Sequence, residues 1–336
     1  MLPFGIDLES VKDLMPRIVN VAGAQLGPVG RTESRREVVA RMIDLMRKAK
    51  WRGANLVVFP ELALTTFFPR WNLTEDNELD GFYETSMPNP KVQPLFDEAR
   101  RLGVGFYLGY AELVHEETAA GHRKRRFNSA ILVDHAGNII GKYRKVHLPG
   151  HAQFDPTLPW QHLEKKYFEP GDLGFPVWRT MGGVMGMMIC NDRRWPESYR
   201  VMGLKGVELV MLGFNTPAMN RNGVEAHYLR VYHSNLVVCS GAYQNGTWVV
   251  AVAKAGKEEG VDMCGTSIIV APSGEIVAQT HTLGDEVITA ECDLEACQFN
   301  KSTIFAFHEH RRPDAYGIIT SQAGATPPPA GHRGPF

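Results

Sequence analysis

The chain has 336 residues, of which 44% are hydrophobic and 22% are charged, a composition typical of a globular protein that buries a large core. Its formal net charge of −1 argues against nucleic acid and against a charged membrane surface as partners, which leaves a small-molecule substrate. The sequence contains no apolar run of about 18 residues and no N-terminal signal pattern, so we expect a cytoplasmic protein.

The cysteines and histidines follow no metal-binding pattern. There is no C-x-x-C pair and no zinc-type spacing, so the cysteines are expected to be reduced thiols. His308 and His310 have no partner at a ligand spacing and are expected at the surface. The five cysteines are Cys190, Cys239, Cys264, Cys292 and Cys297.

The first predicted elements form a βαβ unit. Residues 18–25 are expected to form a short strand. Ser34 and Glu37 make an S-x-x-E capping box before a helix with one apolar face. Residues 55–59 are a short apolar run without alternation, which is typical of a strand buried on both faces. Glu61 is therefore expected at a strand's carboxyl end, with a helix cap or a loop carboxylate as the alternative.

A β-hairpin is predicted in the middle of the chain. The basic run within residues 115–126 is typical of a solvated loop rather than of an anion site. Residues 127–133 and 139–143 follow it and are joined by turn-forming residues, which indicates two antiparallel strands. The second strand leads directly into Lys145 and His147.

A thiol followed by charged residues marks the most informative stretch. The apolar run 185–189 ends at Cys190, and Asn191, Asp192 and two arginines follow before Pro196 begins a predicted helix. This pattern indicates a strand that delivers a thiol to a polar crevice, where a helix N-terminus would lower the thiol pKa. The alternative is a structural cysteine, because free cysteines are among the most buried residues.

The remaining elements make the fold class α/β, or α+β, in layers. We expect one domain over residues 1–320 and a flexible Pro/Gly/Ala-rich tail at 321–336. Residues 151–174 are predicted to be an ordered loop. Further predicted helices lie at 92–102, from 196, and at 225–239 with Leu229, Tyr232, Leu236 and Cys239 on one side, and further strands lie at 104–111, 207–212, 247–253, 266–271, 276–280 and 287–292.

Glu61, Lys145 and Cys190 each follow a predicted strand, so one sheet edge could bring them together. Their chemistry is complementary, because a carboxylate in a partly dry pocket can take the proton of a thiol. An ammonium can then stabilise the oxyanion that forms when the thiolate attacks a carbonyl carbon.

Three motifs resemble those of the nitrilase superfamily of carbon–nitrogen hydrolases, in order and in spacing. They are Phe59-Pro60-Glu61, the segment from Tyr143 to Leu148, and Ile189-Cys190-Asn191-Asp192. Within the superfamily, residues 161–164, 167–172, 190–197 and 243–245 resemble the N-carbamoyl-D-amino acid amidohydrolases (D-carbamoylases). The similarity runs from about residue 17 to about residue 320.

The resemblance implies a four-layer αββα sandwich that forms a homodimer or homotetramer and needs neither a metal nor an organic cofactor. It implies hydrolysis of a ureido group to an amino acid, carbon dioxide and ammonia. Glu61 would be the base, Cys190 the nucleophile, and Lys145 with the Asn191 N–H the oxyanion site. Glu164 would position Lys145 or the attacking water, with a loop ion pair as the alternative.

The substrate carboxylate is expected to meet at least one of Arg193 and Arg194, the other being structural. Other candidate substrate contacts are His147, His162, Asn215 and Thr216, with structural roles as the alternative for both histidines. The competing functions are those of a β-ureidopropionase, an N-carbamoylputrescine amidase, an aliphatic amidase or a catalytically silent binding protein.

Overall fold

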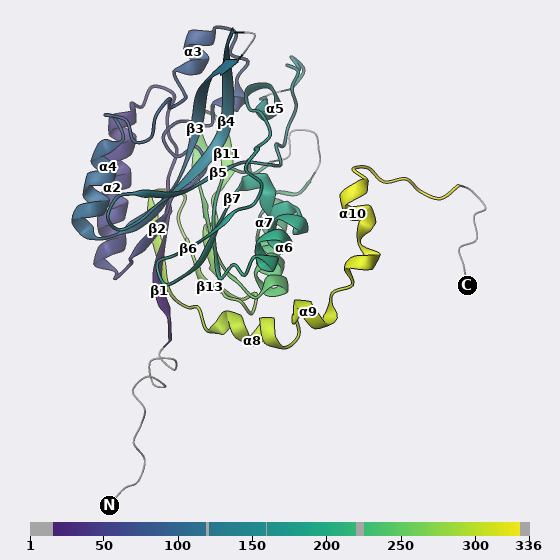
Figure 1. Cartoon of the computed structure of the whole chain (residues 1–336). Helices are drawn as coiled ribbons and strands as arrows, with labels where there is room; N and C mark the ends of the chain where they lie inside the picture. Colours follow the sequence, from purple (N-terminus) through teal and green to yellow (C-terminus); the bar gives the residue numbers. More distant parts are fainter. Residues whose placement is uncertain (1–15, 119–120, 159, 220–224, 330–336) are drawn as a thin grey trace, which may run out of the picture.

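Two six-stranded sheets pack face to face at the centre of the protein (Figure 1). The computed structural model describes residues 16–118, 121–158, 160–219 and 225–329. The first sheet has the order β14-β1-β2-β3-β4-β5, with β1 (Ile18–Gln25), β2 (Leu56–Val58), β3 (Gly105–Thr118), β4 (Gly121–Val133), β5 (Ile139–Arg144) and β14 (Glu286–Asp293). The second has the order β13-β12-β9-β8-β7-β6, with β6 (Val177–Thr180), β7 (Gly183–Ile189), β8 (Leu209–Phe214), β9 (Trp248–Ala253), β12 (Ile268–Val270) and β13 (Ile276–Gln279).

Helices cover the outer face of each sheet and complete four layers. Helices α2 (Arg35–Trp51) and α4 (Gln93–Leu102) pack on the first sheet, and α6 (Pro196–Leu204) and α7 (His227–Asn245) lie on the second (Figure 1). This arrangement confirms the expected αββα fold class. The shorter elements are η1 (Phe68–Arg70), α3 (Asp76–Asp80), α5 (Glu164–Tyr167), η2 (Cys190–Arg194), β10 (Ala255–Glu258), β11 (Val261–Cys264), α8 (Ala296–Ser302), α9 (Phe307–His310), η3 (Pro313–Ala315) and α10 (Gly317–Ser321).

The βαβ unit forms as its sequence predicts. Ser34 caps α2 by accepting the Glu37 backbone N–H, and the Glu37 side chain accepts the Ser34 N–H in return. The apolar face of α2 is buried, and β1 pairs with β2 in parallel. Every residue of β7 is also buried, because the strand lies inside its sheet with side chains between the layers. The strand that precedes Cys190 is therefore held on both faces.

The predicted loop at residues 115–126 is wrong, because most of this stretch extends the β3–β4 ladder. Pairing continues from Phe106 opposite Val133 out to Thr118 opposite Gly121. The basic side chains are neutralised by carboxylates: Lys124 and Arg126 bind Asp80, and Arg125 binds Glu116, Glu169 and Asp172. Cross-strand and loop ion pairs thus give the charged segment regular structure.

Two other expectations also require correction. Glu61 and Lys145 follow strands of the first sheet, whereas Cys190 follows β7 of the second, so no single sheet edge carries all three. On α7 the side expected to be apolar faces outward, with Tyr232 56% and Leu236 47% exposed. The buried positions of α7 include Ser234, Val238 and Ala242, on the side of the helix that packs toward the second sheet.

The C-terminal segment after α8 passes along the outer side of α6, where the Arg200 guanidinium lies over the Phe307 ring of α9. Helix α8 follows the sandwich, and α9 and α10 continue outward from it (Figure 1). None of the residues in α9, η3 or α10 is buried. Residues 322–329 are exposed and belong to no helix or strand, while 330–336 of the predicted tail and residues 1–15 lie outside the described residues.

Candidate active site

A buried ion cluster joins Glu61, Lys145 and Glu164. The Lys145 Nζ donates to Glu61 Oε1 at 2.7 Å and to Glu164 Oε2 at 2.6 Å. The side chains of all three residues are fully buried. Because an ammonium has three N–H donors, the two carboxylates leave one for another acceptor. The structure therefore brings these three predicted residues into direct contact.

Glu61 is held where the two sheets come together. A Cβ added at Gly213 of β8 would lie 2.5 Å from the Glu61 backbone N, so only glycine allows β8 to approach this closely. Asn128 donates its side-chain N–H to Glu61 Oε1 at 2.7 Å, and the Asn215 backbone N–H donates to Oε2 at 2.9 Å. These bonds orient both carboxylate oxygens from two different sheets.

Cys190 lies on a strained turn that follows β7. Its φ of 48° lies in the left-handed region, which costs a non-glycine residue about 1–3 kcal/mol. Asp192 stabilises the turn by accepting the Tyr143 hydroxyl at 2.7 Å and the Ile189 backbone N–H at 3.1 Å. Arg193 donates to the Cys190 carbonyl at 2.6 Å. A strained strand-to-helix turn presents a nucleophile in the same manner in other hydrolases.

The thiol is protonated in the resting site. Burial and the negative charge of Glu61 raise the pKa of Cys190 above its ordinary value, against the opposing effect of Lys145. The expected lowering of this pKa by a helix N-terminus is therefore outweighed. The Sγ lies 3.7 Å from the Asn215 carbonyl, which can accept the thiol proton in a weak hydrogen bond.

Lys145 and Glu164 remain ionised in this dry environment. Burial would lower the pKa of Lys145, but the negative charges of Glu164 and Glu61 hold it above its ordinary value. Burial would likewise raise the pKa of Glu164, but Lys145 and His162 hold it below its ordinary value. The cluster thus contains a permanent ammonium beside a neutral thiol, which is the arrangement that oxyanion stabilisation requires.

The two arginines occupy different environments. Arg193 is 1% exposed, and its guanidinium donates to Thr216 Oγ1 at 2.9 Å and to Ser234 Oγ at 3.0 Å. Arg194 is only partly buried, and its hydrogen bond within the described residues goes to Asn191 Oδ1 at 3.2 Å. The positive charge of Arg193, together with burial, lowers the pKa of Arg194 to about 10. Arg193 is thus a scaffold residue, and Arg194 is the better candidate for a substrate contact.

The other candidate contacts touch catalytic or turn residues. His162 Nε2 lies 2.9 Å from Glu164 Oε1, and His147 Nδ1 lies 2.8 Å from Asp192 Oδ1. Asn215 holds Glu61, and Thr216 accepts from Arg193. Contact of these residues with substrate stays a prediction. Within the protein they hold the side chains of catalytic or turn residues in place.

Sequence reasoning missed three polar groups of this site. Asn128 lies inside a predicted strand, where an amide facing the core is the one available signal. Asp192 was noted beside the nucleophile without a role, although a carboxylate two residues after a turn residue often accepts nearby backbone N–H groups. Tyr143 belongs to the Lys145 motif, but its hydroxyl contact to Asp192 joins two sheets and has no local signal.

A pocket of about 470 Å³ is lined by chain neighbours of the site residues, although none of Glu61, Lys145, Glu164 and Cys190 lines it. Val146 and Asn191, which line it, directly follow Lys145 and Cys190 in the chain. His147 and Trp195 stack with ring centroids 5.3 Å apart and form part of its wall.

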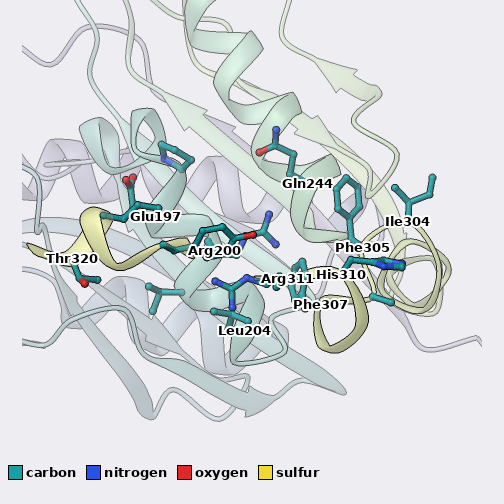
Figure 2. A pocket seen from close by; sticks show the side chains of 15 residues that line it. Glu197, Arg200, Leu204, Gln244, Ile304, Phe305, Phe307, His310, Arg311 and Thr320 are labelled. Atoms are coloured by element: carbon teal, nitrogen blue, oxygen red, sulfur yellow. The ribbon is translucent and has the colours of Figure 1, made fainter. Parts of the chain in front are cut away.

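A larger groove of about 750 Å³ lies on the outer side of α6, away from the catalytic cluster. Figure 2 shows Arg200 and Leu204 of α6 facing Phe307 and Arg311 of the C-terminal segment across it. None of Glu61, Lys145, Glu164 and Cys190 lines this groove.

The expected assembly into a homodimer or homotetramer stays a prediction.

The described residues contain no group of three or more His, Cys, Asp or Glu side chains arranged to hold a metal ion. All five cysteines are free. None of the helices in the described ranges is both long and apolar enough to cross a membrane.

Comparisons with known proteins agree with this geometry. Residues 20–301 match the family model described as carbon-nitrogen hydrolase. The chain is 29% identical over 297 residues to an N-carbamoylputrescine amidase of Arabidopsis thaliana, covering 85% of this chain and 91% of that protein. It is 31% identical over 291 residues to a citrullinase of Francisella tularensis, covering 84% and 92%.

The fold is also similar to a crystal structure of a carbon-nitrogen hydrolase from Helicobacter pylori G27. The TM-score is 0.73 at 25% identity, and the match covers 90% of this chain and 98% of the other. The family match covers most of the chain and includes Glu61, Lys145, Glu164 and Cys190. The protein therefore belongs to the carbon-nitrogen hydrolase family.

Proposed function

We propose that this protein hydrolyses the ureido C–N bond of N-carbamoyl amino acids, with the D-isomers as its expected substrates. The observation that carries the reaction type is the buried contact of Lys145 with Glu61 and Glu164 beside a strained cysteine. The motif resemblance to D-carbamoylases supports the D-configuration.

The relatives support a ureido substrate. N-carbamoylputrescine and citrulline, which the names of two relatives contain or imply, both end in a ureido group. They differ in the rest of the molecule, because the first ends in an amine and the second carries a carboxylate. The half-buried Arg194 guanidinium, next to the positively charged Arg193, favours a carboxylated substrate over a cationic one.

The first half of the reaction forms a covalent enzyme. Glu61 takes the proton of Cys190, and the sulfur attacks the ureido carbon to give a tetrahedral oxyanion. The remaining N–H of Lys145 and the Asn191 backbone N–H stabilise that oxyanion, and one such donor is typically worth about 3–4 kcal/mol of barrier. Collapse breaks one C–N bond, and the leaving nitrogen takes the proton from Glu61.

The second half releases the enzyme. Glu61 takes a proton from water, whose oxygen attacks the carbon bound to sulfur. The C–S bond breaks, the proton returns to the Cys190 sulfur, and the released carbamate gives carbon dioxide and whichever of ammonia and the amino acid did not leave in the first half. Glu164 holds Lys145 in place for both halves, since its second oxygen is fixed by His162.

The substrate is tested by measuring ammonia release from matched ureido compounds. The set contains N-carbamoyl-D- and L-amino acids, N-carbamoyl-β-alanine, citrulline and N-carbamoylputrescine, with an aliphatic amide as the comparison. We expect the highest kcat/KM with an N-carbamoyl-D-amino acid. A preference for N-carbamoylputrescine would make the second candidate, favoured by the relatives, the correct one. Hydrolysis of the simple amide alone would remove the ureido assignment.

A catalytically silent member is distinguished by its thiol. Stoichiometric alkylation of Cys190 by iodoacetamide, accompanied by loss of ureido hydrolysis, supports the enzyme. An unreactive Cys190 in a folded protein supports a binding function instead.

A further inference from the structure

A second buried ion cluster lies outside the catalytic residues, and the proposed mechanism does not use it. Glu258 at the end of β10 binds Arg70 Nη2 at 2.6 Å and lies 3.4 Å from Lys254 Nζ. The side chains of Glu258 and Lys254 are fully buried, and that of Arg70 is 3% exposed. Removing one partner of such a buried cluster is strongly destabilising. We therefore ask which part of the backbone the cluster holds in place.

The cluster grips the loop formed by residues 62–70, which begins immediately after Glu61. Glu258 Oε1 accepts the Phe67 backbone N–H at 2.7 Å and the Thr66 hydroxyl at 3.3 Å. Lys254 donates to the Thr65 carbonyl, and Arg70 donates to the Glu258 carbonyl as well as to its side chain. Three successive residues of the loop, 65–67, are therefore bonded to one buried charge cluster.

The same loop also supports the second carboxylate. The Gln161 backbone N–H donates to the Arg70 carbonyl at 3.1 Å, and the Leu163 N–H donates to the Pro69 carbonyl at 2.8 Å. Glu164 follows Leu163 directly. The Phe67 ring also meets the His162 ring edge to face at 5.4 Å, and His162 binds Glu164. The loop thus begins next to Glu61, and its end is bonded to the residues that directly precede Glu164.

We infer that Glu258, with Lys254 and Arg70, is a positioning device that sets the spacing of the two carboxylates on either side of Lys145. This inference rests on the proposed function, because it assigns a role within the same reaction. Misplacing a catalytic group by about 1 Å from a distant site can cost about a hundredfold in rate. A device of this kind acts through the loop and does not touch substrate.

The charged groups of the cluster shift one another's pKa values, which agrees with their close contact. Burial would raise the pKa of Glu258, but Lys254 and Arg70 hold it below its ordinary value. Burial lowers the pKa of Lys254, and Glu258 opposes this effect, with a smaller contribution from Glu61. The last contribution places Lys254 within electrostatic reach of the proposed base.

The test compares Glu258→Gln with a matched control, Glu208→Gln. Glu208 is also a buried glutamate that binds an arginine, Arg17, at 2.7 Å and a backbone N–H, that of Val184, at 2.9 Å. Glu208 directly precedes β8 and binds Val184 near the start of β7, whereas Cys190 follows the end of β7. Glu208 has no contact with residues 62–70 among those described. Both variants lose a buried carboxylate charge, but only Glu258→Gln loosens the loop.

For each variant we would measure the rate of Cys190 alkylation, the kinetics of ureido hydrolysis and the thermal midpoint of unfolding. For Glu258→Gln we expect the rate of Cys190 alkylation by iodoacetamide and the kcat for ureido substrate to fall about ten- to a hundredfold. We expect KM to change less than about threefold, because Arg194 lies on η2 and not on the loop. Glu208→Gln should lower the thermal midpoint of unfolding by a similar amount and keep the wild-type alkylation rate and kcat.

Either of two results would overturn the inference: wild-type alkylation and kcat in Glu258→Gln, or an equal loss of both in Glu208→Gln. If Glu258→Gln yields no folded protein, Lys254→Met removes the contact to Thr65 while leaving Glu258 with Arg70, and a smaller fall in the same two rates is expected. Unchanged rates in Lys254→Met would then overturn it. The alkylation rate needs no substrate, so a wild-type protein that alkylates without hydrolysing any ureido compound refutes the proposed function alone.

Discussion

The two buried ion clusters are built from the same chemical groups but are finished differently. The catalytic cluster holds two carboxylates and one ammonium, whereas the Glu258 cluster holds one carboxylate and two cations. Both oxygens of Glu258 are occupied by backbone and side-chain donors from a loop and a strand end. The catalytic cluster, unlike the Glu258 cluster, lies beside a thiol on a strained turn.

The difference shows that burial of charge alone does not indicate catalysis. The Glu258 cluster holds the backbone of residues 65–67 in place, whereas the cluster next to the thiol is the one proposed to take part in the reaction. Perturbed ionisable groups occur in both kinds, so the feature that separates the two clusters is the thiol on a strained turn beside one of them. Substitutions in the two clusters should therefore separate loss of rate from loss of stability.

The largest effect is expected for Cys190→Ala, which removes the nucleophile that only the catalytic cluster has beside it. We expect kcat to fall by at least about 10⁴-fold, because no other group can form the covalent intermediate. Ammonia release measures the rate. Cys292→Ala, which changes another buried thiol, should retain activity, and a comparable loss there would show that thiol substitution simply disrupts the core.

The next largest effect is expected for Glu61→Gln, which keeps the size of the side chain and removes the base. General acid–base catalysis contributes about 10²–10⁴-fold, so kcat should fall by that factor. The thermal midpoint should change less than in Glu258→Gln, since the amide oxygen can still accept from Lys145. A Glu61→Gln variant with wild-type kcat would assign the base to another group.

Lys145→Met is expected to lower kcat by about 10²–10³-fold, the usual cost of losing one oxyanion donor. It also leaves Glu61 and Glu164 without their shared cation, so protein yield and unfolding temperature should both be measured. The rate should fall even in protein that is confirmed to be folded by circular dichroism. A folded variant with full activity would contradict the role of this ammonium.

The two arginines provide a smaller and more specific comparison. Arg194→Lys should raise KM for an N-carbamoyl amino acid about tenfold with little change in stability, because lysine lacks the planar fork that binds a carboxylate. Arg193→Lys should mainly lower stability, since Arg193 bonds the Cys190 carbonyl and two hydroxyls in the core. An unchanged KM in both variants would count against carboxylate recognition here.

The smallest effect concerns the dependence of stability on pH. Glu164 and Glu258 both have folded-state pKa values below their ordinary ones, despite the opposing effect of burial. Their contribution is therefore present above the ordinary carboxyl pKa and is lost as the pH falls through the lowered folded-state values. Urea unfolding between about pH 5 and about pH 2 should show falling stability, with a shallower fall in Glu258→Gln than in wild type.

Local patterns in the sequence were sufficient for much of the fold. The Ser34–Glu37 capping box predicted the start of α2, and the apolar run before Cys190 predicted a buried strand. Both predictions succeeded because helix capping and hydrophobic periodicity depend on residues close in the chain. The prediction of a loop over the basic run was wrong, because β3 and β4 extend through it. This extension is stabilised by carboxylates far along the chain, such as Asp80 and Glu169.

The identities of Glu61, Lys145 and Cys190, and their positions after strands, were determined by the sequence alone. Only the tertiary structure decided that they meet across two sheets, that Arg193 is a scaffold residue, and that Asn128 and Asp192 belong to the site. The reason is physical: residue type and local spacing set what a side chain can do. Its partner, however, is selected by packing between segments that lie far apart in the chain, and no local pattern records that packing.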